Sequence, residues 1–134
     1  MHTISKKFSF EAAHRLVPPY SGKCSHLHGH CWSVRLFLSS QQLDERGFVR
    51  DFTELRPLRE WIAENLDHST LVSDRDKVLL GWLQTNNQKH FVLRGNPTSE
   101  ILAQLLFETS CTLGLEVSQV EVCETESASA VYRR

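Results

Sequence analysis

The 134-residue sequence carries almost no net charge and no strongly basic stretch, which excludes two classes of partner. Fifteen Lys and Arg side chains stand against sixteen Asp and Glu, for a formal net charge of −1. A chain so close to neutrality exerts no long-range attraction on nucleic acid or on an anionic membrane. We therefore expect neither of them as a partner.

Long apolar runs, proline and glycine are also scarce. No segment approaches the roughly 20 apolar residues of a membrane span, and the N-terminus has no apolar stretch of signal-peptide length. Four prolines and six glycines, with 40% hydrophobic residues, are typical of a compact globular protein rather than a disordered or fibrous one. We expect residues 1–134 to form a single domain, located in the cytoplasm.

The four cysteines do not predict a disulfide framework. Their even number would suit two bridges in a small secreted domain, but nothing else in the sequence indicates secretion. We expect free thiols, so that a functional cysteine acts as a thiolate or as a metal ligand.

Alternating hydrophobicity predicts two long strands that pair antiparallel. Apolar side chains occupy every second position in residues 3–13, with Lys6 as the misfit, and again in residues 28–40. A loop at residues 17–23, rich in proline, serine and glycine, separates the two. The same pattern predicts shorter strands at residues 48–52, 90–94, 117–124 and 128–134.

Apolar residues that recur at intervals of three and four positions predict a first helix over residues 53–66, with Asp51 or Thr53 as its N-cap. Leu66, Asp67 and His68 end this helix. Residues 69–89 give no clear pattern beyond a short helix or helical turn at 78–83.

A second helix is predicted after the motif at residues 95–100, with Asn96 or Thr98 as its N-cap and Gly114 at its end. The buried stripe is expected to be Ile101, Leu102, Leu105, Leu106 and Thr109. Strands and helices together indicate an α+β domain.

Four of the seven histidines lie near one another in the sequence and predict a Zn²⁺ site. His28 and His30 point to the same face of a strand, roughly 6 to 7 Å apart at the backbone. His14 is the third ligand if the two long strands pair, while His26 has the same parity and remains an alternative. Three imidazoles leave one coordination position open, as in catalytic zinc sites. Cys24 is a further zinc ligand, an inert buried thiol or a catalytic thiolate.

Six motifs, in order along the chain, resemble those of the 6-pyruvoyltetrahydropterin synthase superfamily. They are FEAAHRL at 10–16, CSHLHGH at 24–30, VRDF at 49–52, LDH at 66–68, NPTSE at 96–100, and ET at 124–125 with AVY at 130–132. The three-residue gap between Cys24 and His28 is similar to that of the bacterial 6-carboxytetrahydropterin synthase branch, which acts in queuosine (7-deazapurine) biosynthesis.

The resemblance implies a fold and an assembly. The fold is the T-fold, expected as a four-stranded antiparallel sheet with two helices packed on one face. The assembly is a homo-oligomer, a hexamer, with active sites at the subunit interfaces.

The resemblance also implies a role for each site residue. His14, His28 and His30 bind Zn²⁺, Cys24 is a general base, Asp67 and His68 form a second proton-transfer pair, Glu124 anchors the pterin, and Thr98 and Ser99 bind the substrate. Without the resemblance, Asp67 and His68 would be a pair at the helix C-terminus and Glu124 a solvated strand residue.

Two assignments stay open at this point. Strand alternation puts Glu126 on the same face as Glu124, so that only the resemblance favours Glu124 as the pterin anchor. No cluster of basic residues marks a triphosphate site, for which Arg15, Lys23 and residues of a neighbouring subunit are candidates.

The implied reaction converts 7,8-dihydroneopterin triphosphate to 6-carboxy-5,6,7,8-tetrahydropterin, with release of acetaldehyde and triphosphate. Formation of 6-pyruvoyltetrahydropterin, or cleavage of sepiapterin, is an alternative on the same site. An alternative of another class is a non-catalytic zinc- or pterin-binding module in which Cys24 is the fourth metal ligand.

Overall fold

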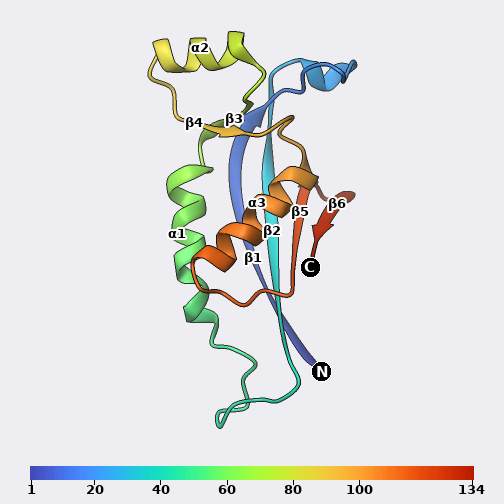
Figure 1. Cartoon of the computed structure of the whole chain (residues 1–134), viewed down its shortest axis with the longest axis vertical. Helices are drawn as coiled ribbons and strands as arrows, with labels where there is room; N and C mark the ends of the chain where they lie inside the picture. Colours follow the sequence, from blue (N-terminus) through green and yellow to red (C-terminus); the bar gives the residue numbers. More distant parts are fainter.

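A computed structural model describes residues 1–134, and its framework is one six-stranded sheet (Figure 1). β1 (His2–His14) and β2 (His28–Ser40) pair antiparallel along their whole length, as predicted. β5 (Gln119–Thr125) pairs antiparallel with β2, and β6 (Ala128–Tyr132) pairs antiparallel with β5. These four strands make up the antiparallel part of the sheet.

The expectation of a four-stranded, purely antiparallel sheet is wrong, because two more strands extend it to a mixed sheet. β3 (Ser69–Ser73) pairs parallel with the end of β1, and β4 (His90–Leu93) pairs parallel with β3. Parallel neighbours need a crossover, which here contains helix α2 (Lys77–Thr85). Four of the five β3 residues are buried, so that strand shows no alternation by which the sequence could have revealed it.

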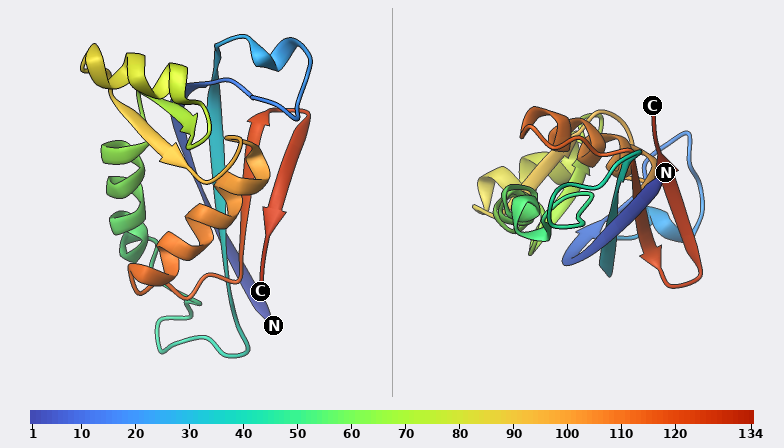
Figure 2. Two further views of the ribbon diagram at one scale, coloured as in Figure 1. Left: turned by 45° about the horizontal axis from the view of Figure 1, so that its top comes forward. Right: turned by 90° about the horizontal axis from the view of Figure 1, so that it is seen from below.

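Helices α1 (Arg56–Asn65) and α3 (Ser99–Thr112) cover one face of the sheet (Figure 2). Even-numbered side chains of β1 and β2, including Phe10, Trp32 and Leu36, form a single hydrophobic core with the apolar sides of both helices. Alternation along the two long strands therefore predicted correctly which face is buried.

The third helix, α2, packs on the other face at the edge of the sheet. Leu71 and Val72 are neighbours in β3 and point to opposite faces of the sheet. Leu71 belongs to the main core, whereas Val72 forms a separate small cluster with Leu79 and Leu83. Asp76 begins the helix by accepting a hydrogen bond from the Leu79 N–H at 3.2 Å. The fold thus has three helices instead of the two that the resemblance implies, and the third lies where the sequence indicated a short helix or a helical turn.

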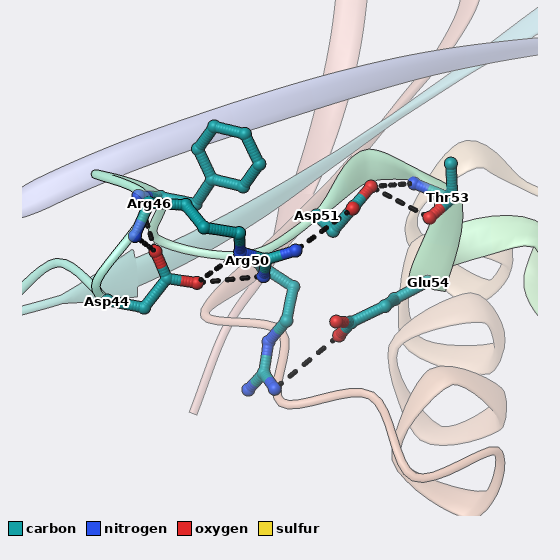
Figure 3. A network of polar contacts seen from close by, with 7 residues as sticks. Asp44, Arg46, Arg50, Asp51, Thr53 and Glu54 are labelled. Atoms are coloured by element: carbon teal, nitrogen blue, oxygen red, sulfur yellow. Dashed lines mark hydrogen bonds and ion pairs between the residues drawn. The ribbon is translucent and has the colours of Figure 1, made fainter.

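Residues 48–52, predicted as a strand, instead form an irregular segment tied by side chains (Figure 3). Arg46 donates hydrogen bonds to Asp44 at 2.8 Å and to Asp51 at 3.3 Å. Asp51 also accepts from the backbone N–H of Thr53 at 2.9 Å and starts the 3-10 turn that leads into α1. Asp51 therefore caps this 3-10 turn, whereas α1 itself follows Leu55 without a side-chain cap, so the predicted N-cap lies one turn before the α-helix. The strand is wrong because these local bonds replace pairing in the sheet.

Helix α3 begins and ends where the sequence predicts. Thr98 is its N-cap, since the Thr98 hydroxyl accepts from the Ile101 N–H at 3.3 Å, and Gly114 follows its end with a left-handed φ of 79°. The predicted stripe is only partly right, because the helix buries a broader face consisting of Leu102, Ala103, Leu106, Phe107 and Ser110. None of the three helices has the length and apolarity needed to cross a bilayer.

Candidate metal centre and active site

The three histidines predicted to bind zinc lie close to a glutamate at one end of the sheet. His14 ends β1 directly opposite His28 at the start of β2, and His30 follows on the same face. Glu124 reaches the same place from the end of β5. The ligand atoms of these four side chains all lie within 4.8 Å of one another. Pairing of the two long strands therefore brings the third imidazole to the other two.

The spacing of the four ligand atoms fits a small tetrahedral ion. His14 Nε2 lies 3.1 Å from His28 Nε2 and 3.4 Å from Glu124 Oε1, which in turn lies 2.6 Å from His30 Nε2. Ligand atoms about 2.0 Å from a tetrahedral ion stand roughly 3.3 Å apart. His30 Nε2 is buried and, despite its nearness to Glu124, lacks hydrogen-bond geometry with any group. A metal ion would satisfy this nitrogen.

Backbone carbonyls orient two of the imidazoles. His14 Nδ1 lies 2.8 Å from Pro97 O, and His28 Nδ1 lies 2.6 Å from His26 O. An Nδ1–H that donates to a carbonyl leaves the Nε2 lone pair free to bind a metal. Burial lowers the pKa of His14, which favours the same neutral form. His26 contributes its carbonyl, while its exposed side chain is outside the group of four.

Two residues that the sequence did not assign to the site support it. Trp32 is fully buried, and the centre of its ring lies 5.0 Å from that of His14 and 5.4 Å from that of His30. Asn96 accepts from the Val17 N–H at 2.8 Å and donates to the Val17 carbonyl at 2.9 Å. Trp32 could have been found from its parity with the histidines, whereas the contacts of Asn96 have no signal in the sequence.

A hollow of about 280 Å³ opens beside the cluster. Its lining includes His14 and Glu124 on one side and the N-terminus of α3, with Thr98 and Ser99, on the other. The structure therefore brings the two residues predicted to bind substrate next to the predicted metal ligands.

Glu126 does not share a face with Glu124, contrary to the expectation from alternation. The pairing of β5 with β6 is irregular between Cys123 and Thr125, and Glu126 lies in the turn that follows. Glu126 lines a different hollow, together with Arg35. Only Glu124 lies beside the histidines.

Cys24 lies in a short 3-10 turn and outside the group of four. Its backbone N–H donates to the Tyr20 hydroxyl at 3.3 Å, and its carbonyl accepts from the Leu16 N–H at 2.8 Å. Hydrogen bonding to the thiol raises the pKa of the Tyr20 hydroxyl. All four cysteines are free, as predicted, and Glu124 instead of Cys24 stands fourth beside the imidazoles.

Asp67 and His68 form a hydrogen-bonded pair on a turn after α1. Asp67 Oδ2 lies 2.9 Å from His68 Nδ1, and Asp67 Oδ1 accepts from the Glu11 N–H at 2.9 Å. The Glu11 N–H, helped by His68, holds the pKa of the Asp67 carboxyl below its ordinary value. The His68 side chain is 75% exposed and lines a second hollow of about 500 Å³, together with His30. His68 and Glu124 therefore line different hollows of one chain.

Arg15, a candidate for triphosphate binding, is committed to another partner. Its guanidinium donates two hydrogen bonds of 2.7 Å to the buried Asp76 carboxylate. Arg15 holds the pKa of Asp76 below its ordinary value. Lys23, the other candidate, is exposed. The ion pair ties the end of β1 to the start of α2.

Curated relatives are similar to this chain over most of its length. The 6-carboxy-5,6,7,8-tetrahydropterin synthase of Rickettsia bellii is 33% identical over 105 residues, which cover 77% of this chain and 75% of the relative. The synthase of the same name from Synechocystis is 36% identical over 138 residues, which cover 98% and 93%.

Solved structures share the fold. An uncharacterized protein of Wolinella succinogenes has a TM-score of 0.77 at 29% identity, covering 99% of this chain and 98% of that one. The 6-pyruvoyl tetrahydropterin synthase of Caenorhabditis elegans has a TM-score of 0.74 at 24% identity, covering 99% and 95%. The family model described as 6-pyruvoyl tetrahydropterin synthase matches residues 3–134. The chain belongs to the 6-pyruvoyl tetrahydropterin synthase family.

Proposed function

We propose that this chain is a zinc-dependent, cytoplasmic 6-carboxy-5,6,7,8-tetrahydropterin synthase. It would convert 7,8-dihydroneopterin triphosphate and one water to 6-carboxy-5,6,7,8-tetrahydropterin and release acetaldehyde and triphosphate. One observation carries the proposal: three imidazoles and a carboxylate converge beside a hollow lined by Thr98 and Ser99. The names of the curated relatives support the same activity.

The zinc ligands in this proposal are His14, His28 and His30. Three neutral imidazoles and one carboxylate oxygen form a ligand set typical of zinc. If the carboxylate oxygen dissociates, the fourth coordination position becomes available to the substrate. Zinc held there would act as a Lewis acid toward the oxygens of the substrate side chain.

Glu124 anchors the pterin. Its side chain is 30% exposed, at the boundary between the imidazoles and the hollow. A carboxylate there can accept two parallel hydrogen bonds from the amide N–H and exocyclic amine of the ring. Thr98 and Ser99 are among the polar residues that line the same hollow.

Cys24 and His68 share the proton transfers. The Cys24 thiolate removes a proton from a side-chain carbon of the substrate, and His68, oriented by Asp67 at 2.9 Å, serves the second transfer. His68 and Glu124 line different hollows of one chain. We therefore include in the proposal a homo-oligomer, a hexamer by resemblance, in which subunits complete one another's sites.

Product identification tests the proposed reaction. The protein, loaded with zinc, is incubated with 7,8-dihydroneopterin triphosphate, and we expect one acetaldehyde for each pterin converted. Accumulation of a pyruvoyl pterin without acetaldehyde would contradict the proposal in favour of the alternative reaction. Zinc binding without any turnover would favour a binding module.

A further inference from the structure

The segment between β3 and β4 brings Lys89 against the proposed proton-transfer pair. Lys89 Nζ donates a 2.6 Å hydrogen bond to the backbone carbonyl of Asp67 and a 3.1 Å bond to that of Ala63. These carbonyls belong to the last turn of α1 and to the turn that follows it, where cations are stabilised. The ammonium group therefore lies against the backbone immediately before His68.

His68 has a conformation that needs such support. Its φ is 56°, in the left-handed region that side chains other than glycine rarely adopt. Residues keep such a conformation only where their surroundings over-determine it, and they cluster at functional sites. The strain lies at the residue proposed to transfer a proton.

The peptide group that joins Asp67 to His68 is held at both ends. Its N–H donates to the Glu11 carbonyl at 2.6 Å, and its carbonyl accepts from Lys89 at 2.6 Å. The Asp67 carboxylate adds bonds to the Glu11 N–H and to the His68 ring. Contacts from β1 fix one side of this turn, and Lys89 fixes the other.

The sheet determines where Lys89 stands. Its carbonyl accepts from the Thr70 N–H at 3.0 Å, at the point where β3 and β4 begin to pair. Lys89 also lines the hollow of about 500 Å³ into which the His68 side chain projects. The extra strand and helix therefore place a cation at the rim of that hollow.

We propose that Lys89 is a positioning residue for His68: it fixes the Asp67–His68 peptide so that the imidazole faces the hollow with Nδ1 on Asp67. The inference rests on the proposed function, in which His68 transfers a proton. The competing explanation is that Lys89 only caps the C-terminus of α1 through Ala63 and contributes to stability.

Substitution of Lys89 tests the inference. Lys89→Met removes the donor and keeps the length of the side chain, Lys89→Arg keeps a donor, and Lys77→Met makes the same change at an exposed lysine at the start of α2. Zinc content, thermal midpoint, kcat, KM and the rate of His68 modification by diethyl pyrocarbonate, followed by peptide mass spectrometry, are measured for each.

We expect Lys89→Met to lower kcat about tenfold or more with KM changed less than about twofold, because misplacing a catalytic group affects the chemical step. The modification rate of His68 should change in the same variant, while zinc content stays the same. Lys89→Arg should restore both kcat and the modification rate, and Lys77→Met should behave as the unsubstituted protein.

Two results would overturn the inference. One is Lys89→Met with an unchanged kcat and an unchanged His68 modification rate. The other is a lower thermal midpoint with the His68 modification rate unaltered, which is what a cap alone predicts. If the Met variant does not fold, Lys89→Ala, which also removes the donor, takes its place. Diethyl pyrocarbonate needs no turnover, so the inference is judged even if the unsubstituted protein lacks the proposed activity.

Discussion

The histidine cluster stands on two strands that are paired over all thirteen residues of each, whereas the Asp67–His68 turn is held by a few hydrogen bonds from Glu11 and Lys89. The cluster is the more enclosed of the two: His14 is 1% exposed and lies against the buried Trp32, and the other three side chains are half-buried. His68, by contrast, is 75% exposed. The histidine cluster of the proposed active site therefore lies next to the hydrophobic core, whereas the His68 side chain lies at the surface of the protein.

This difference separates two ways of fixing functional groups. Strand register positions the imidazoles, so the geometry of the metal centre follows from the same pairing that builds the sheet. At the Asp67–His68 turn, a strained backbone depends on hydrogen bonds from β1 and from the loop before β4. Substitutions should therefore affect metal binding in the first region and the chemical step in the second.

Removal of His14 should have the largest effect. His14→Ala removes the proposed zinc ligand contributed by β1, and we expect zinc content near zero and a loss of turnover of at least about a thousandfold. Metal analysis after dialysis measures this directly. His26→Ala is the matched control and should keep its zinc; stoichiometric zinc in His14→Ala would return His26 to the ligand set.

Replacement of Cys24 should separate chemistry from metal binding. Because Cys24 lies outside the group of four, Cys24→Ala should lower kcat by about 10²–10⁴-fold while zinc remains bound. Cys111→Ala, on the exposed side of α3, should change neither quantity. Loss of zinc from Cys24→Ala would show that the thiol is a ligand and not a base.

A smaller effect is expected from Asn96, which ties the chain before Pro97 to Val17. Asn96→Ala should loosen the Pro97 carbonyl that orients His14, and it should weaken zinc affinity about 10–100-fold without abolishing it. Competition with a chromophoric chelator measures the affinity. An affinity equal to that of the unsubstituted protein would mean that the carbonyl does not orient the ring.

The cluster and the turn also differ in how far the sequence predicted them. Alternation placed His28 and His30 on one face, and pairing of the long strands added His14, because both follow from a period of two residues. The roles of Asp67 and His68 came only from the resemblance. Their geometry depends on hydrogen bonds to Glu11 and Lys89, which are remote in sequence and leave no periodic pattern.

The other wrong predictions from the sequence also result from contacts that leave no periodic pattern. Strand β3 is buried and does not alternate, and the irregularity after Cys123 turns Glu126 away from Glu124. Local side-chain bonds around Asp51 replaced a strand that the apolar residues alone suggested. In each case a contact outside the pattern determined the structure.

The smallest predicted effect concerns the ion pair that ties β1 to α2. Asp76→Asn should destabilise the metal-free protein by about 1–2 kcal/mol at pH 7, since Arg15 is partly exposed to water. The pKa of Asp76 lies below its ordinary value of 3.8. The ion pair therefore contributes its full stabilisation above pH 3.8, and this stabilisation is lost as the pH falls through the lowered pKa. Urea unfolding at pH 7 and near pH 3 should show that the difference in unfolding free energy between Asp76→Asn and the unsubstituted protein is smaller at the lower pH.

Glu60→Gln, at an exposed position of α1, is the control for this pH dependence and should leave the free energy of unfolding unchanged at both pH values. A destabilisation of Asp76→Asn that stays constant from pH 7 to pH 3 would mean that the ion pair is not its cause.

X-ray absorption at the zinc edge tests most directly whether the histidine cluster, without Cys24, forms the metal centre. We predict a first shell of nitrogen and oxygen atoms near 2.0–2.1 Å with the multiple scattering of about three imidazoles. A sulfur atom near 2.3 Å would contradict the account, because it would make Cys24 a ligand and leave the proposed reaction without its base.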